Sequence, residues 1–215
     1  IPFRSGYSPR RWQKATQVMI LKKAGIWDVN KLRTIVLFEA DYNHNNGHLG
    51  RSMMHHAVDH HLLAHEQYST PGKKCIDQVL NRVLLFDITR YQKSTLAITS
   101  CDLASCYDRI CHTPATLAMA SLGIPLEPIQ SMFSTFQSCQ FYTRTAYGDS
   151  TSCWGGHEDN YIASPQGTGQ GNQCGPAAWA AVSSKMFQVL HNAKLASQII
   201  GPITNETVSL CSFAF

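Results

Sequence analysis

Short apolar runs alternate with longer helical repeats along this chain, and the alternation predicts a protein that mixes strands and helices. Apolar and β-branched runs predict strands at residues 18–21, 32–38, 96–101, 139–146 and 207–215. Helical spacing of apolar positions predicts helices near residues 50–65, 76–93, 114–122, 127–136 and 176–196. We therefore expect an α+β fold in which helices back a sheet.

Composition agrees with a folded, mildly basic protein. The chain has 215 residues, 44% of them hydrophobic, which is enough to bury one core divided between two lobes. The formal net charge of +4 permits contact with nucleic acid without demanding it. Basic residues concentrate early, at Arg4, Arg10, Arg11, Lys14, Lys22, Lys23, Lys31 and Arg33. By charge alone, a solvated surface is the simpler explanation for them.

Two further features bear on the location of the protein. No apolar run approaches the roughly 20 residues of a membrane span, so no membrane partner is expected. The eight cysteines form no Cys-x-x-Cys pair, and their spacing fits neither a zinc ribbon nor a small disulfide scaffold. Free thiols in a reducing compartment are expected, which indicates an intracellular protein without distinguishing nucleus from cytoplasm.

The segment from Ile98 to Ile110 carries the most informative chemistry. An apolar run ends on Asp102, and an aromatic residue, Tyr107, follows five positions later. A strand that ends on an acid delivers a carboxylate to an edge or a cleft, and carboxylates bind divalent metals. The alternative is an ordinary strand followed by an Asp that caps a helix. Taken alone, the segment leaves both interpretations open.

A second segment, residues 164–179, is rich in glycine, proline and glutamine and runs into an alanine-rich stretch. Glycines let a backbone approach a ligand closely, and Pro176 suits the first turn of a helix. The segment lacks the Gly-Lys-Ser/Thr ending of a P-loop and the surrounding βαβ unit of a dinucleotide-binding fingerprint. A loop that opens a helix at a ligand is one interpretation, and a plain surface loop is the other.

Together the two segments resemble motifs A and B of reverse transcriptases. Asp102 with Tyr107 matches motif A, and Gln170-Gly171 with Pro176 matches motif B. Upstream, Trp12, a Lys-Lys-x-Gly turn at residues 22–25 and an Arg-x-Ile at residues 33–35 resemble the fingers of non-LTR retrotransposon enzymes. The resemblance implies fingers and fingers–palm helices over residues 1–95 and an incomplete palm over residues 96–215. An antiparallel palm sheet backed by helices is expected, and the thumb is absent.

The resemblance also implies roles for individual residues. Asp102 and the main-chain carbonyl of Leu103 would bind catalytic Mg²⁺ or Mn²⁺, and Tyr107 would lie under the deoxyribose and exclude a 2′-hydroxyl. The triphosphate would be neutralised by Lys22 or Lys23 together with Arg33. Gln170, followed by Gly171, would contact the nucleotide or the template beside it. Asp108 is left outside the metal set, because it could instead cap the next helix or pair with Arg109.

One departure from the family pattern matters. Reverse transcriptases carry an aromatic-x-Asp-Asp motif, whereas this sequence contains no Asp-Asp pair. Its last predicted strand, residues 207–215, resembles the strand that leads into that motif. We expect this strand to pair antiparallel with residues 96–101, since acids from two strands must meet at a two-metal site. The chain is interpreted as part of a longer protein, and residues 1–215 alone are not expected to polymerise.

Three functions follow as hypotheses. The first is RNA-directed DNA polymerisation by a mobile element, with an RNA template, a DNA primer and deoxynucleoside triphosphates as partners. The second is a catalytically inactive remnant that still binds nucleic acid. The third is a metal-binding module built on five histidines, His55, His56, His60, His61 and His65, of which 56 with 60 and 61 with 65 would share helix faces. A solvated helix face is the simpler account of the histidines. Oligomeric state, element class, flanking domains and priming mode are not determined by the sequence.

Overall fold

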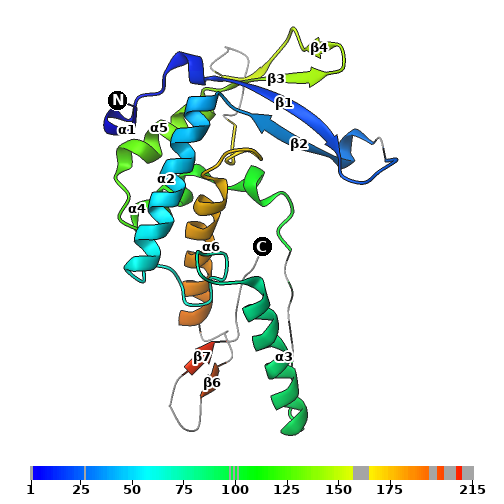
Figure 1. Cartoon of the computed structure of the whole chain (residues 1–215), viewed down its shortest axis with the longest axis vertical. Helices are drawn as coiled ribbons and strands as arrows, with labels where there is room; N and C mark the ends of the chain where they lie inside the picture. The colour runs from blue at the N-terminus through cyan, green and yellow to red at the C-terminus, as the bar shows by residue number, and fades with distance from the viewer. Residues whose placement is uncertain are drawn as a thin grey trace. The chain divides into compact units, whose positions relative to one another are not determined.

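The computed structural model describes residues 2–26, 28–96, 98, 100, 102–156, 165–193, 198–200 and 207–209 (Figure 1). The chain divides into two compact units, each made of two separate stretches. The first unit combines Ile1–Met53 with Ser105–Trp179, and the second combines Met54–Ala104 with Ala180–Phe215. Both units therefore take residues from the predicted fingers segment and from the predicted palm segment.

The structure confirms the predicted mixture of helices and strands. The α-helices are α1 (Pro2–Ser5), α2 (Ala40–Asp59), α3 (Cys75–Tyr91), α4 (His112–Ala120), α5 (Leu126–Gln137) and α6 (Gly175–Asn192). The 3-10 helices are η1 (Arg10–Trp12), η2 (Val29–Lys31) and η3 (Cys106–Arg109). The strands are β1 (Lys14–Leu21), β2 (Leu32–Leu37), β3 (Gln140–Thr145), β4 (Gly148–Asp149), β5 (Trp154–Gly155), β6 (Gln198–Ile200) and β7 (Thr207–Ser209).

The sheet of the first unit is mixed, in contrast to the expected antiparallel palm sheet. Strands β1 and β2 form an antiparallel hairpin in which Val18 faces Ile35. Strand β3 lies parallel to β1, with Tyr142 beside Thr16, and β4 and β5 each pair antiparallel with β3. Helices separate β1 and β2 from β3 in the sequence, and a long crossover of this kind allows a strand to return in the same direction.

The predicted pairing of residues 96–101 with residues 207–215 is wrong for the described residues. Leu96, Ile98 and Ser100 have no strand structure, and residues 97, 99, 101 and 210–215 lie outside the described part of the chain. Strand β7 pairs antiparallel with β6, in a register that places Ile199 opposite Val208. A partner that is close along the chain has a small loop-closure cost, so β7 completes its backbone hydrogen bonds locally.

Helix α2 begins and ends earlier than the predicted helix at residues 50–65. Its first turn is stabilised by the Glu39 carboxylate, which accepts a hydrogen bond from the Asp41 amide at 3.0 Å. The polar residues at the start of the helix obscured its apolar period in the sequence. Its end is followed by His61 in a left-handed conformation, with φ of 52°. The other long helices, α3, α4, α5 and α6, overlap their predicted ranges closely.

The core of the first unit lies on one face of the sheet. Ala15, Val36 and Phe141 point toward Phe136 of α5, and the rings of Phe136 and Phe141 lie 5.5 Å apart. Tyr42 of α2 is fully buried and donates a hydrogen bond to the Met132 carbonyl at 3.0 Å. Burial also raises the pKa of this phenol, which stays neutral. The sheet, α2 and α5 therefore pack together, and α2 and β2 of this scaffold contact the glycine-rich segment.

Candidate functional site

In the first unit, the part of the motif A-like segment that begins at Ser105 meets the motif B-like segment. We call residues 165–174 the glycine loop and residues 105–110 the tyrosine turn. The amide of Thr168 donates to the carbonyl of Tyr107 at 2.8 Å, and the amide of Gly167 donates to the carbonyl of Ile110 at 2.9 Å. The tyrosine turn contains η3 and begins at Ser105, which has a left-handed conformation. Two stretches that are distant in sequence are thus joined backbone to backbone.

This close approach requires glycine at two positions of the loop. Gly167 has φ of +84°, and a side chain there would press into the backbone of Tyr107 and Asp108. Gly171 has φ of +127°, and a Cβ there would overlap the carbonyl oxygen of Val36. Both the positive φ and the lack of space exclude larger residues. The glycines predicted to allow a close backbone approach do so, with the protein's own chain as the neighbour.

Gln170 links the glycine loop to β2 and to the tyrosine turn. Its carbonyl accepts a hydrogen bond from the Val36 amide at 2.6 Å, so the loop continues the hydrogen bonding along the edge of the strand. Its side chain hydrogen-bonds the carboxylate of Asp108. Burial raises the pKa of Asp108, and the bond from Gln170 opposes that rise. Asp108, which the sequence left between a helix cap and a pair with Arg109, therefore supports Gln170.

A residue that the sequence analysis missed fastens the other side of the loop. The Asn43 side chain donates to the Gly171 carbonyl at 2.9 Å and accepts from the Gln173 amide at 2.9 Å. An asparagine amide offers a donor and an acceptor side by side, so it binds two backbone groups at once. Nothing in the spacing of the sequence relates a polar residue of α2 to a loop so far along the chain.

Tyr107 lies against the beginning of α6. A Cβ at Gly175 would sit 3.5 Å from Cδ1 of the tyrosine ring and 3.2 Å from Oγ1 of Thr168. The ring is half-buried, and burial raises the pKa of its phenol, which therefore stays neutral at neutral pH. The ring packs from one side against the loop and the helix, which restricts its orientation.

The predicted phosphate-binding cations lie on the β1–β2 hairpin. Lys22 and Lys23 follow the end of β1 and are exposed, and Arg33 of β2 faces Ile20 across the hairpin. Arg33 is three residues from Val36, or about 10 Å along an extended strand. Because Val36 binds Gln170, a single strand joins the cationic end of the hairpin to the glycine loop.

Asp102 and Leu103 belong to the second unit and are exposed, whereas Tyr107, Gln170 and Gly171 belong to the first. Among the described residues, no group of three or more His, Cys, Asp or Glu side chains is arranged to hold a metal ion. Mg²⁺ takes about six oxygen ligands, of which Asp102 and Leu103 would supply two. The described residues alone therefore do not fit a catalytic metal pair, and no step through the metal is derived from them.

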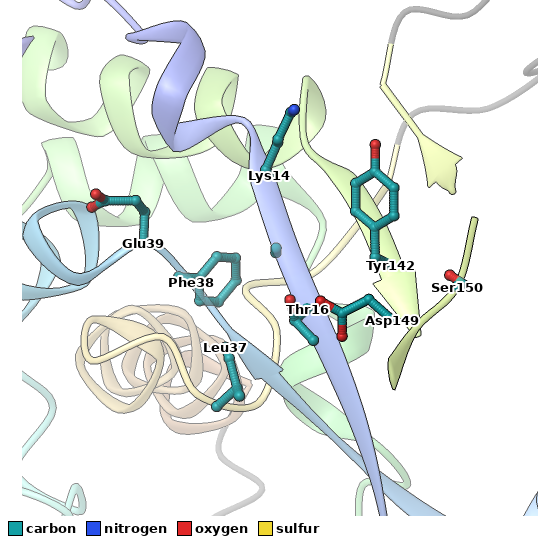
Figure 2. A pocket seen from close by; sticks show the side chains of 9 residues that line it. Lys14, Thr16, Leu37, Phe38, Glu39, Tyr142, Asp149 and Ser150 are labelled. Carbon is teal, nitrogen blue, oxygen red and sulfur yellow. The ribbon is translucent and has the colours of Figure 1, made fainter. Parts of the chain in front are cut away.

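A hollow on the outer face of the sheet was also missed by the sequence analysis (Figure 2). Its lining includes Lys14, Thr16, Leu37 and Tyr142, which alternate along the strands with the core residues. Figure 2 shows Lys14 and Tyr142 projecting to the same side from β1 and β3. Asp149 at its edge is paired through both carboxylate oxygens with Arg144, which lowers the pKa of Asp149.

The predicted pairing of histidines on one helix is partly wrong. The rings of His56 and His60 are neighbours, 4.2 Å apart, as helical spacing predicts. His61 and His65, however, lie beyond the end of α2, so they share no helix face. The left-handed conformation of His61 turns the chain at that point and ends the helical repeat.

Comparison with models of known protein families finds no match, and comparison with curated protein sequences finds none either. Within the described ranges, none of the helices combines the length and the hydropathy that crossing a membrane requires.

We expect replacement of Gly171 by alanine to destabilise the chain more than replacement of Gly148. Both glycines have positive φ, but nothing lies within 4 Å of a Cβ at Gly148. Gly148→Ala should therefore cost only the backbone strain, about 1–2 kcal/mol. Gly171→Ala adds the collision with Val36 and should cost about 1–3 kcal/mol more. Urea unfolding followed by tryptophan fluorescence measures both, and equal losses would contradict the close approach of the loop to β2.

Proposed function

We propose that this chain forms the fingers and part of the palm of an RNA-directed DNA polymerase of a mobile element. The observation that carries the proposal is the contact between the glycine loop and the tyrosine turn. Each segment was first singled out by its own residue pattern, the two together resemble reverse transcriptase motifs A and B, and a nucleotide pocket requires those motifs to adjoin. Chance resemblance in two unrelated loops gives no reason for such a contact.

In the proposed pocket, Tyr107 lies beneath the sugar of the incoming deoxynucleotide. Its ring is supported on one side by the start of α6, so it cannot retreat easily from a 2′-hydroxyl. Gln170 lies beside it, with its amide oriented by Asp108 and its carbonyl bound to β2. A pocket whose walls are fixed before the substrate arrives discriminates best between sugars, because a yielding wall would tolerate the additional hydroxyl.

The β1–β2 hairpin contributes the positive charge in this proposal. Lys22 or Lys23 acts with Arg33 to neutralise the triphosphate, and Arg33 suits a bidentate grip on phosphate oxygens. A Mg²⁺ or Mn²⁺ ion would supply further positive charge for phosphoryl transfer. The proposal assigns Asp102 and the carbonyl of Leu103 to that metal, together with further oxygens outside the described residues.

A second candidate is a protein that binds nucleic acid without catalysis. It is favoured by the exposed cations of the β1–β2 hairpin, since Lys22, Lys23 and Arg33 can contact phosphates without any metal. In that case the glycine loop and tyrosine turn would serve only to brace the hairpin through β2.

Primer extension separates the two candidates. The native polypeptide, with any residues that follow Phe215, should extend a DNA primer on an RNA template. Asp102→Asn should reduce extension by about 10³-fold or more, since metal charge stabilisation is worth several kcal/mol. Template binding by the same variant should be unchanged. Binding without extension by the native polypeptide would instead support the second candidate.

Sugar selection tests the role of Tyr107. Tyr107→Val should lower the preference for deoxyribonucleotides over ribonucleotides by about ten- to a hundredfold, because a steric collision costs about 1–3 kcal/mol. Tyr107→Phe is the matched control and should be nearly neutral, since the ring rather than the hydroxyl excludes the ribose. The measurement is single-nucleotide incorporation with each substrate. An unchanged ratio in Tyr107→Val would remove the sugar-excluding role.

Salt dependence tests the hairpin as a phosphate-binding surface. Replacing both Lys22 and Lys23 by alanine should decrease the slope of log affinity against log salt concentration by about 1.5, since each phosphate contact contributes about 0.7–0.9. Arg90→Ala with Lys93→Ala removes the same charge from exposed positions outside the hairpin and should leave the slope nearly unchanged. Fluorescence anisotropy with a labelled RNA–DNA hybrid measures the slopes. Equal slopes in the two double variants would argue against the hairpin.

A further inference from the structure

His112, the first residue of α4, uses both ring nitrogens in hydrogen bonds. Its Nε2 lies 2.6 Å from the carbonyl oxygen of Gly167, and its Nδ1 lies 2.8 Å from the side-chain nitrogen of Gln137. A carbonyl oxygen only accepts, so Nε2 carries the proton and donates it. The amide nitrogen of Gln137 donates, so Nδ1 is the acceptor. The two partners together select one tautomer of a neutral imidazole.

The imidazole is held in place from its faces as well as from its edges. It stacks on Phe133 with ring centroids 4.5 Å apart and meets Phe136 edge-on at 5.7 Å. Both rings belong to the buried side of α5, which makes the support rigid. Burial lowers the pKa of His112, which agrees with a neutral ring at neutral pH. The donor hydrogen of Nε2 is therefore aimed in a fixed direction.

Gly167 is the residue of the glycine loop that His112 contacts. Its carbonyl accepts from His112, its amide donates to Ile110, and the next amide, that of Thr168, donates to Tyr107. Gly167 has φ of +84°, and hydrogen bonds hold both the peptide before it and the peptide after it. Gln170 follows three residues later, so the hydrogen bonds of Gly167 and Thr168 help to fix its position.

We propose that His112 is a positioning residue that, in its Nε2-protonated neutral form directed by Gln137, fixes the glycine loop against the tyrosine turn. The effect on nucleotide binding rests on the proposed polymerase function, whereas the effect on the loop does not. His112 touches neither the nucleotide nor the reacting atoms. It acts through Gly167 on the relative placement of Tyr107 and Gln170.

Hydrogen exchange of the chain tests the effect on the loop without any need for activity. His112→Ala should speed exchange of the Thr168 amide by about fivefold, because a lost hydrogen bond is worth about 1 kcal/mol. His112→Gln is the matched variant, since a glutamine amide nitrogen can replace Nε2 as the donor, and it should restore most of the protection. Unchanged protection of Thr168 in a folded His112→Ala protein would overturn the proposal.

The tautomer of His112 can be measured, and a histidine that only filled space would not need a single tautomer. In the native chain, ¹⁵N spectra should show Nε2 protonated and Nδ1 unprotonated. Gln137→Leu removes the donor to Nδ1 while keeping a side chain of similar size, so the ¹⁵N resonance of Nδ1 should shift as it loses its hydrogen bond, while Nε2 stays protonated against the Gly167 carbonyl. A mixture of tautomers in the native chain would contradict the proposal. The ¹⁵N spectra therefore test the proposal even if His112→Ala does not fold.

Nucleotide kinetics test the functional half. In the native polypeptide, His112→Ala should raise KM for deoxynucleoside triphosphates by about fivefold with a smaller change in kcat, and His112→Gln should recover most of the loss. If the native polypeptide shows no extension, the proposed function fails, while exchange and spectra still decide the role of His112 in the loop. Altered exchange with an unchanged KM would overturn the link from His112 to the nucleotide.

Discussion

The hydrogen bond from the Val36 amide to the Gln170 carbonyl is the interaction on which the candidate site depends. Among the described strands, β2 pairs with β1 alone, so its other edge presents backbone groups that need partners. The glycine loop supplies one, and Gly171 allows the approach because any side chain there would overlap the strand. Asn43, Asp108 and His112 then fix the loop from three further directions.

This arrangement gives one physical path between groups that the proposed reaction needs together. The cations at the end of the β1–β2 hairpin share a strand with Val36, and Gln170 is bound to that residue. Gln170 and Thr168 are bound in turn to the tyrosine turn, through Asp108 and Tyr107. Most of these connections are hydrogen bonds between backbone groups. Substitutions of exposed side chains on the glycine loop can therefore alter nucleotide binding without separating the β1–β2 hairpin from the tyrosine turn.

Each expectation that failed has a physical reason. The start of α2 was missed because its first turns carry asparagines and histidines; among these, Asn46 is buried and Asn43 binds the glycine loop. The partner of β7 was misassigned because an apolar run predicts a strand but does not predict which other strand pairs with it. In the described residues, the nearer strand, β6, was the partner. The parallel pairing of β1 with β3 likewise depends on how the intervening helices pack.

By itself, the sequence determined the mixture of helices and strands, the ranges of most long helices and the two segments whose residues carry the proposed chemistry. Those properties follow from local periodicity and from residue type, which act over a few positions. Only the tertiary structure decided that Thr168 meets Tyr107, that Asn43 holds Gly171 and that His112 directs a proton at Gly167. Each of these contacts joins distant segments through at least one backbone group. Every residue except proline carries the same backbone donor and acceptor, so residue type does not predict which of these groups will pair.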